Sequence, residues 1–174
     1  MRYKKLILRS PEPEDLELLF KWENDPTMWE LSGTLVPFSK HTLRRYIEDA
    51  GKSIYEMGQV RLMIDLTTDT TIGTVDLFDF DPYHLRAGIG ILIADHDHRN
   101  SGYATMAIEG VIEYGFRKLR LHQLYCNILS DNATSMKLFT KLGFKQVGIK
   151  KEWIRSDKIF KDEILLQLIS DHSH

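Results

Sequence analysis

The chain has 174 residues, of which 43% are apolar and 28% charged, an ordinary composition for one globular domain with its own core. Its 23 basic and 25 acidic side chains give a formal net charge of -2, which excludes the strongly basic surface that non-specific nucleic-acid binding needs. The sequence contains no apolar run long enough for a membrane span, and LIL at 6–8 is too short for a signal peptide. A single cysteine, Cys126, cannot form an internal disulfide and fits a reducing compartment. We therefore expect one domain over residues 1–174, located in the cytoplasm, with neither nucleic acid nor membrane as a partner.

The first half of the chain predicts a strand, two helices and a hairpin. The strand covers residues 3–9, and a helix over 10–25 follows, begun by the pair Ser-Pro and stopped by the pair Asp-Pro. A second helix is predicted over 39–50, where a glycine ends it. Segments 60–65 and 71–80 are rich in β-branched and aromatic residues and flank the turn-like sequence TTD, which is typical of an antiparallel hairpin.

The second half alternates strands and helices. RAGIGILIA at 86–94 is an unbroken apolar run and predicts a strand buried on both faces. The further elements expected are a helix after Gly102, a strand at 123–129, a helix at 132–142, and strands at 145–154 and 159–168. The order β-α-α-β-β-β-α-β-α-β-β predicts an α/β protein in which helices cover a mixed sheet.

One stretch, DHDHRNSGYATMAIEGVIEYGF at 95–116, places a polar loop directly before an amphipathic helix. A helix N-terminus exposes unpaired N–H groups and the positive end of the helix dipole, and Gly102 lets a bulky group approach the backbone. Arg99 adds a positive charge, so this loop suits a phosphate group. The alternative interpretation is an ordinary loop in which Asn100 or Ser101 caps the helix.

Together with two other segments, this loop resembles the GNAT superfamily of N-acetyltransferases. Arg99-x-x-Gly102-x-Ala104, after a buried strand, is similar to that superfamily's coenzyme A pyrophosphate loop, Arg/Gln-x-x-Gly-x-Gly/Ala. NATSMKLFTKLGF at 132–144 resembles its helix that an Asn opens and Gly-Phe ends. LRSPEPEDLELLFKWENDP at 8–26 resembles the branch with the ribosomal-protein N-terminal (alanine) acetyltransferases and the spermidine acetyltransferases.

The resemblance implies a mixed, mostly antiparallel central sheet with helices on both faces, and acetyl-CoA as co-substrate in direct transfer through a ternary complex. It implies that strand 88–93 separates from strand 123–128 and that pantetheine adds to the exposed edge, held by backbone N–H groups. The residues that it implies in cofactor binding are Ile91, Leu92, Ile93, Arg99, Asn100, Ser101, Gly102, Tyr103, Ala104, Asn132 and Phe139. It also implies that the chain can form a homodimer.

Two positions depart from the superfamily's pattern. Phe139 stands where a Tyr often protonates the departing thiolate, and Gly88 stands where a Glu often activates the amine. Because general acid–base help contributes about 10²–10⁴-fold, the reaction can still proceed with substitutes. Ser135 could donate a proton to the thiolate, or could bond only to the backbone. Gly88 and Gly90 either ease a close approach of the cofactor or serve packing, and Cys126 is interpreted as an apolar filler.

Acidic residues favour a cationic acceptor. Asp76 and Asp79 lie on opposite faces of their predicted strand if alternation holds, so at most one can face a central cleft. We favour Asp76, which could bind the cation or accept its proton, although it could equally be a solvated strand carboxylate. Together with Glu30, these residues favour a primary amine such as a polyamine-like molecule, an aminoglycoside or a protein N-terminus.

Other classes of function stay open on the sequence alone. A regulatory module could keep the coenzyme A clamp without catalysis, as Phe139 and Gly88 would allow. An assembly protein could pair its edge strands between subunits and ignore the cofactor. His96 and His98 have no partner ligand at a useful spacing, so no metal site is expected.

Overall fold

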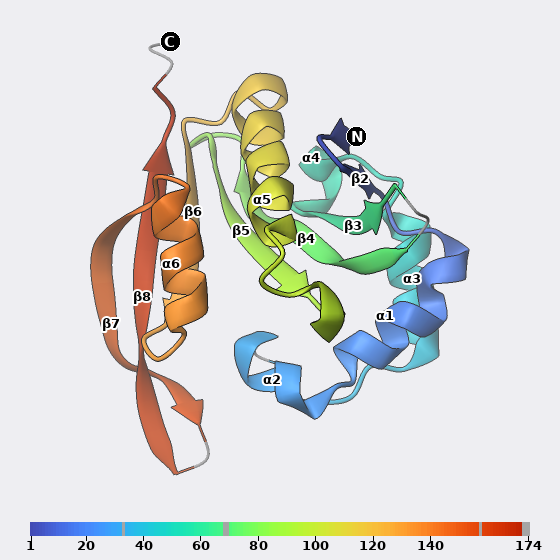
Figure 1. The fold of residues 1–174 in the computed structure, drawn as a ribbon, viewed down its shortest axis with the longest axis horizontal. Coiled ribbons are helices and arrows are strands. Elements are labelled where there is room, and N and C mark those ends of the chain that lie inside the picture. The colour runs from blue at the N-terminus through green and yellow to red at the C-terminus, as the bar shows by residue number, and fades with distance from the viewer. Residues whose placement is uncertain (33, 68–69, 157, 172–174) are drawn as a thin grey trace.

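The computed structural model describes residues 1–32, 34–67, 70–156 and 158–171, which form an eight-stranded sheet with helices on both faces (Figure 1). The strands are β1 (Arg2–Tyr3), β2 (Leu6–Arg9), β3 (Val60–Leu66), β4 (Thr71–Asp81), β5 (Arg86–Ile93), β6 (Gln123–Leu129), β7 (Lys145–Ser156) and β8 (Ile159–Ile169). Their order is β1-β2-β3-β4-β5-β6-β8-β7. Within the described ranges every neighbouring pair is antiparallel except β5 with β6. The predicted fold class is confirmed.

The helices divide between the two faces of the sheet. They are α1 (Leu16–Glu23), α2 (Pro26–Ser32), α3 (Lys40–Asp49), α4 (Ile54–Met57), α5 (Tyr103–Glu113) and α6 (Ala133–Lys141). Alternation along β3 separates two cores, because Ile64 belongs to the cluster that α5 and α6 cover and Met63 to the cluster that α1 and α3 cover. Both side chains are 0% exposed, and burial of this kind contributes about 1.5–3 kcal/mol for each large apolar residue.

Several predicted elements are confirmed by their local bonds. Ser39 caps α3, since its side chain accepts a hydrogen bond from the Thr42 N–H at 3.1 Å. The hairpin β3–β4 pairs Val60 with Leu77, and residues 68 and 69 of its TTD turn lie outside the described ranges. The helix after Gly102 has its apolar stripe in the core, and a π-helical turn at Tyr114–Lys118 extends it.

Corrections gather in the N-terminal quarter. The predicted strand 3–9 is two strands, because Lys4 adopts φ +52° and reverses the chain. The first helix begins later than Ser10, with a 3-10 turn at Pro13–Asp15, because the Asp15 carboxylate accepts the Glu12 N–H at 2.8 Å. The first helix does end before the pair Asp25-Pro26, but Pro26 then occupies the first position of a further helix, α2, where a proline needs no N–H partner. Neither helix α2 nor the short helix α4 was predicted.

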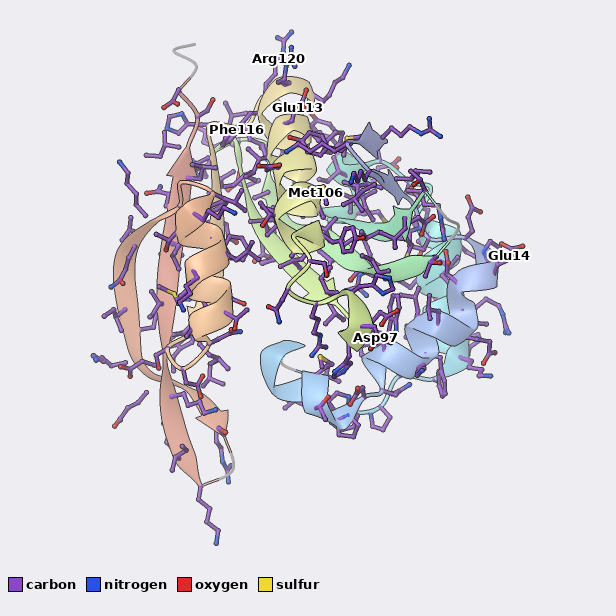
Figure 2. The ribbon with its side chains drawn as sticks, in the orientation of Figure 1. Glu14, Asp97, Met106, Glu113, Phe116 and Arg120 are labelled. Carbon is purple, nitrogen blue, oxygen red and sulfur yellow. The ribbon has the colours of Figure 1, made fainter. Side chains whose placement is uncertain are left out.

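Strand β5 is not buried along its whole length. Residues 87–89 are buried, whereas residues 90–93 are half-exposed, so the prediction of burial on both faces is wrong for the second half. Figure 2 places Glu113 near the end of α5 that is distant from Asp97, which lies in the loop between β5 and α5. No helix within the described residues is long and apolar enough to cross a membrane.

Candidate active site

Strands β5 and β6 run side by side only where they begin. Their parallel pairing joins Arg86, Ala87 and Gly88 to residues 123–125, and past that point β5 pairs with β4 as far as Ile93. A cavity of about 440 Å³, here called the splay cavity, opens where the two strands separate. Its lining residues are Trp22, Glu23, Met28, Arg61, Thr74, Asp76, Ile89, Gly90, Ile91, Leu92, Cys126, Asn127, Ile128, Leu129, Asn132, Ser135, Phe139, Ile154 and Glu163.

The start of α5 is free of side-chain capping. Gly102 is the N-cap residue at φ +83°, and among the described residues no side chain caps the first turn of the helix. The Ser101 hydroxyl instead donates to the carbonyl of Arg99 at 3.3 Å, and Asn100 adopts φ +59°. The interpretation of Asn100 or Ser101 as the cap is therefore wrong. A Cβ at Gly102 would meet no heavy atom within 4 Å, so there is open space beside the start of α5, where a helix N-terminus favours a phosphate.

Arg99 fastens this loop to the end of β5. Its Nε donates to the carbonyl oxygen of Ile93 at 2.9 Å. That bond uses one of the five guanidinium N–H groups, and the terminal nitrogens keep donors for an anionic ligand. The predicted cofactor residues Tyr103 and Ala104 follow in the first turn of α5, next to the same loop.

Helix α6 presents three predicted residues to the splay cavity. Asn132 caps the helix, because its Oδ1 accepts the Ser135 N–H at 3.1 Å, and its amide NH₂ still has donors to offer. This contact uses the backbone of Ser135 and does not engage its hydroxyl. Phe139 is 3% exposed and packs edge-on against Phe144, with ring centroids 5.1 Å apart. Cys126 also borders the cavity, but burial raises its pKa to about 12, so its thiol stays protonated as an apolar filler.

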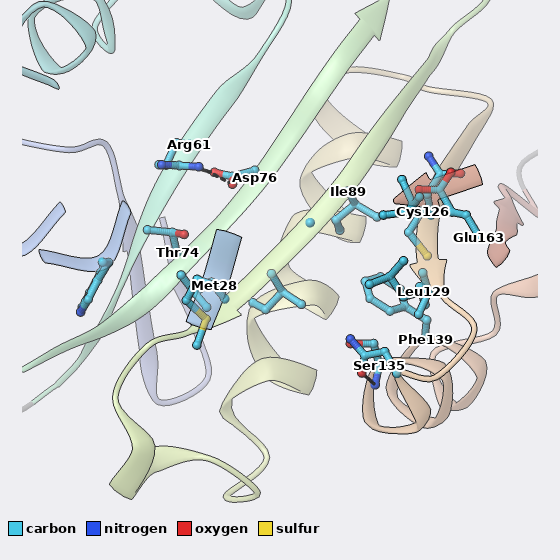
Figure 3. A pocket seen from close by; sticks show the side chains of 18 of the residues that line it. Met28, Arg61, Thr74, Asp76, Ile89, Cys126, Leu129, Ser135, Phe139 and Glu163 are labelled. Atoms are coloured by element: carbon cyan, nitrogen blue, oxygen red, sulfur yellow. Dashed lines mark hydrogen bonds and ion pairs between the residues drawn. The ribbon is translucent and has the colours of Figure 1, made fainter. Parts of the chain in front are cut away.

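An ionic cluster of Glu23, Arg61 and Asp76 also lines the splay cavity. Figure 3 shows Arg61 and Asp76 across the cavity from Ser135 and Phe139. The Arg61 Nε and Nη2 donate to the two oxygens of Asp76 at 2.8 and 3.0 Å, and Nη1 donates to Glu23 Oε1. Burial disfavours the charge of Arg61, but Asp76 and Glu23 outweigh it and raise the guanidinium pKa. One positive and two negative groups leave the cluster a net charge of -1. The guanidinium also lies 5.6 Å from the ring centroid of Tyr46, whose pKa is raised by burial to about 12.

A second cavity of about 600 Å³, here called the outer cavity, meets the splay cavity at this cluster. Its lining residues are Glu23, Phe38, Thr42, Leu43, Tyr46, Gln59, Val60, Arg61, Asp76, Leu77, Phe78, Ile89, Gly90 and Asn127. The residues common to both cavities are Glu23, Arg61, Asp76, Ile89, Gly90 and Asn127. Two ligands that enter from different sides could therefore meet beside the carboxylates.

Close packing explains the departure at Gly88. A Cβ at this position would lie 2.3 Å from Cε2 of Phe78, so no larger residue fits without displacing the ring. Phe78 in turn packs edge-on against Tyr125, with centroids 6.2 Å apart. At Gly90 the nearest Phe78 atom would be 3.6 Å away, which is an ordinary contact. The packing interpretation therefore holds for Gly88, and a carboxylate side chain there would require the Phe78 ring to move.

The structure separates the predicted acceptor residues. Asp76 lines both cavities, but Arg61 occupies both of its oxygens. Asp79 lies elsewhere, because the register shifts after Phe78 and Asp79 adopts φ +48°, which ends the simple alternation. Its Oδ2 accepts the Tyr125 hydroxyl at 3.1 Å, and it lines a different cavity. Glu30 falls in α2, but its side chain lies outside the described part of the chain.

Sequence reasoning missed Glu23, Arg61 and Asn127. The Glu23 and Arg61 positions are 38 residues apart, and no local pattern joins them. One signal was present. Arg61 lies two positions before Met63 on β3, so the two side chains share one face of the strand, and Met63 is buried. A charged residue on such a face requires a partner of opposite charge, and Arg61 has two, Glu23 and Asp76.

A family model for the acetyltransferase (GNAT) domain matches residues 5–145. The chain belongs to the GNAT acetyltransferase family. This membership confirms the expected class, an acetyl-CoA-dependent N-acetyltransferase, and acetyl-CoA as co-substrate.

Relatives of this GNAT protein include the uncharacterized N-acetyltransferase p20 of Bacillus licheniformis, 26% identical over 95% of this chain and 93% of that one. The spermidine N(1)-acetyltransferase of Escherichia coli K12 is 25% identical over 81% of this chain and 73% of its own length. Among solved structures, spermidine N-acetyltransferase from Vibrio cholerae in complex with CoA and spermine has a TM-score of 0.86 at 22% identity, covering 95% of each chain. At that identity the likeness concerns the fold alone.

Proposed function

We propose that this protein transfers the acetyl group of acetyl-CoA directly to a primary amine while donor and acceptor are bound together. The observation that carries the proposal is the meeting of two cavities at the point where β5 and β6 separate. A donor held on one side and an amine on the other would be brought within reach without a covalent enzyme intermediate. The candidate acceptors are a polyamine-like molecule, an aminoglycoside or a protein N-terminus.

The cofactor side supplies a clamp made mostly of backbone. The uncapped N–H groups after Gly102 and the guanidinium of Arg99 would hold the pyrophosphate, with Asn100, Ser101, Tyr103 and Ala104 shaping the loop. The amide of Asn132 would contact the pantetheine arm, which would pair with the edge of β5 like an added strand. Backbone N–H groups of residues 91–93 would polarise the acetyl carbonyl as negative charge develops on its oxygen.

The reaction needs two proton movements. The amine nitrogen forms a bond to the acetyl carbon, the carbon–sulfur bond breaks, the nitrogen loses a proton and the sulfur gains one. We propose that Asp76 binds the positively charged amine before the amine loses its proton, because Asp76 borders both cavities. Ser135 is the proposed donor to the sulfur, since its hydroxyl is not used in the helix cap. Phe139 would pack against the pantetheine arm without donating a proton.

Binding and turnover test the proposal separately. We expect calorimetric titration to show tight binding of acetyl-CoA and none of ATP, and added amine to release free thiol. Arg99→Ala should weaken acetyl-CoA binding about 10-fold to 100-fold, the range for losing a charged hydrogen bond. Arg117→Ala is the matched control, because this arginine pairs with Glu113 at 2.8 Å far from the loop. Equal affinities for the two variants would remove Arg99 from the clamp.

The same experiment distinguishes the other classes of function. Binding of acetyl-CoA without thiol release from any amine would favour a regulatory coenzyme A-binding module. Failure to bind acetyl-CoA would contradict the enzyme and the module together. A single domain over residues 1–174, a homodimer and a cytoplasmic location remain parts of the proposal, the last supported by the one buried cysteine. Sedimentation of the purified protein would decide the oligomeric state.

A further inference from the structure

We infer that the outer cavity selects a small primary amine with one positive charge on an aromatic or other apolar body, in preference to a polyamine or an aminoglycoside. The inference rests on the proposed function and narrows its acceptor. It follows from the charge of the ionic cluster, the rings that line the rest of the outer cavity, and the fixed position of those rings.

The ionic cluster can balance a single ammonium group. Arg61 neutralises one of its two carboxylates, and Asp76 commits both oxygens to that arginine. Glu23 contributes Oε1 to Arg61, so its second oxygen is the one carboxylate oxygen of the cluster that does not accept a hydrogen bond from Arg61. Among the described residues that line the outer cavity, the acidic ones are these two alone. An ammonium beside Glu23 would therefore meet the whole net charge of -1 at the point where the two cavities join.

Apart from the ionic cluster, the described residues that line the outer cavity are uncharged, and they suit the apolar part of a ligand. Phe38, Tyr46 and Phe78 line the cavity, together with aliphatic residues and the uncharged polar residues Thr42, Gln59 and Asn127. A polyamine or aminoglycoside would bring further ammonium groups, which would lose water beside these rings without a carboxylate to pair with. Aromatic faces attract cations, but the Tyr46 ring already carries the guanidinium of Arg61.

This wall is also held in place before any ligand arrives. Asn24 fixes Phe38 in both directions, since its Oδ1 accepts the Phe38 N–H at 2.8 Å and its Nδ2 donates to the Phe38 carbonyl at 3.0 Å. Asn24 directly follows Glu23 at the end of α1, so the backbone that carries the Phe38 ring is tied to the segment that carries the Glu23 carboxylate. Phe78 lies against Gly88 at a distance that no side chain could share. A preformed site of this kind favours a rigid, apolar ligand.

The test compares 2-phenylethylamine, spermidine and kanamycin by thiol release from acetyl-CoA, and by calorimetric binding to the protein saturated with CoA. We expect kcat/KM for 2-phenylethylamine to exceed that for spermidine by at least about tenfold, with the same order in binding. Faster turnover or tighter binding of spermidine or kanamycin would overturn the inference while supporting the proposed function. Absence of thiol release from every amine would contradict the proposed function, and the binding order on the CoA complex would then still decide the inference.

A charge-neutral variant tests the role of Glu23. Glu23→Gln keeps an oxygen for Arg61 but removes the net negative charge, so KM for 2-phenylethylamine should rise about 10-fold to 100-fold. Glu17→Gln is the matched control. It makes the same change elsewhere on α1, where the carboxylate is 71% exposed and pairs with Lys40. The KM of Glu17→Gln should equal that of the wild type. An unchanged KM in Glu23→Gln, with the protein folded by circular dichroism, would remove Glu23 from the acceptor site.

Discussion

Helix α1 is joined to the sheet by two ionic clusters of the same composition, one at each end. At its start Arg9 binds Asp15 and Asp65, and at its end Arg61 binds Glu23 and Asp76. Each cluster holds one arginine from a strand and two carboxylates, so each carries a net charge of -1. Their surroundings differ, since the second lines both the splay cavity and the outer cavity, whereas none of the first cluster's residues lines either.

Under the proposed function, position and not composition separates a cluster that serves stability from one that binds the acceptor. In the Arg9 cluster the carboxylates are 7% and 15% exposed and a further backbone N–H and a threonine hydroxyl saturate them. In the Arg61 cluster the carboxylates are 16% and 25% exposed and face space that a ligand can enter. The first cluster should therefore govern stability, and the second should govern which amine is accepted.

Removal of Arg9 should have the largest effect on stability. Arg9→Met leaves Asp15 and Asp65 buried without their cation, and we expect a loss of about 2–4 kcal/mol in the free energy of unfolding. Urea denaturation followed by circular dichroism measures it. Turnover per folded molecule should be unchanged, because the cluster does not reach the cavities. A fall in kcat/KM larger than the fall in folded fraction would contradict the division of roles.

Removal of Arg61 should cost less stability and change specificity more. In Arg61→Met the remaining carboxylates can be hydrated from the cavities, so we expect a loss of about 1–2 kcal/mol. The local charge becomes -2, which should raise kcat/KM for spermidine relative to 2-phenylethylamine by about tenfold. If Arg61→Met keeps the wild-type ratio of kcat/KM for the two substrates, the Arg61 cluster does not govern acceptor choice, and the two clusters do not differ in role.

The elements on the proposed cofactor side were predictable because their signals are local. Gly102 and Asn132 begin helices α5 and α6 at the predicted positions, since a positive φ and a side-chain cap depend on neighbouring residues. The separation of β5 from β6 followed from the family resemblance. The apolar sequence of β5 did not predict its burial correctly. Its second half is half-exposed, because residues 90–92 line the splay cavity.

The proposed acceptor side could not be predicted in the same way, because it is assembled from distant segments. Arg61 meets Glu23 across 38 positions and Asp76 across 15, and which carboxylates it meets depends on the packing of α1 against β3 and β4. The sequence also left open why position 88 is a glycine. The answer is the ring of Phe78, which the antiparallel register of β4 and β5 places directly opposite.

A smaller and pH-dependent effect is expected at Asp15. Burial alone would raise the pKa of this carboxyl, but hydrogen bonds from Arg9 and Glu12 outweigh it and lower the pKa below 3.8. A lowered pKa in the folded state gives stability that is present above the unfolded-state pKa and lost as the pH falls through the folded value. Asp15→Asn should therefore cost about 1 kcal/mol at pH 7. The free energies of unfolding of the wild type and of Asp15→Asn should approach each other as the pH falls below about 4. A difference that stays constant down to about pH 2 would contradict the assigned cause.

The smallest effect should come from the third ionic contact of α1, between Glu17 and Lys40 of α3. Their side chains are 71% and 46% exposed, and the Lys40 Nζ lies 2.6 Å from Glu17 Oε1. Water already solvates both groups, so Glu17→Gln should change the free energy of unfolding by no more than about 0.5 kcal/mol. Salt provides a second readout, because screening should abolish even this difference at high ionic strength. A loss comparable to that of Asp15→Asn would mean that helix attachment depends on the number of ionic contacts, and not on how deeply the carboxylate is buried.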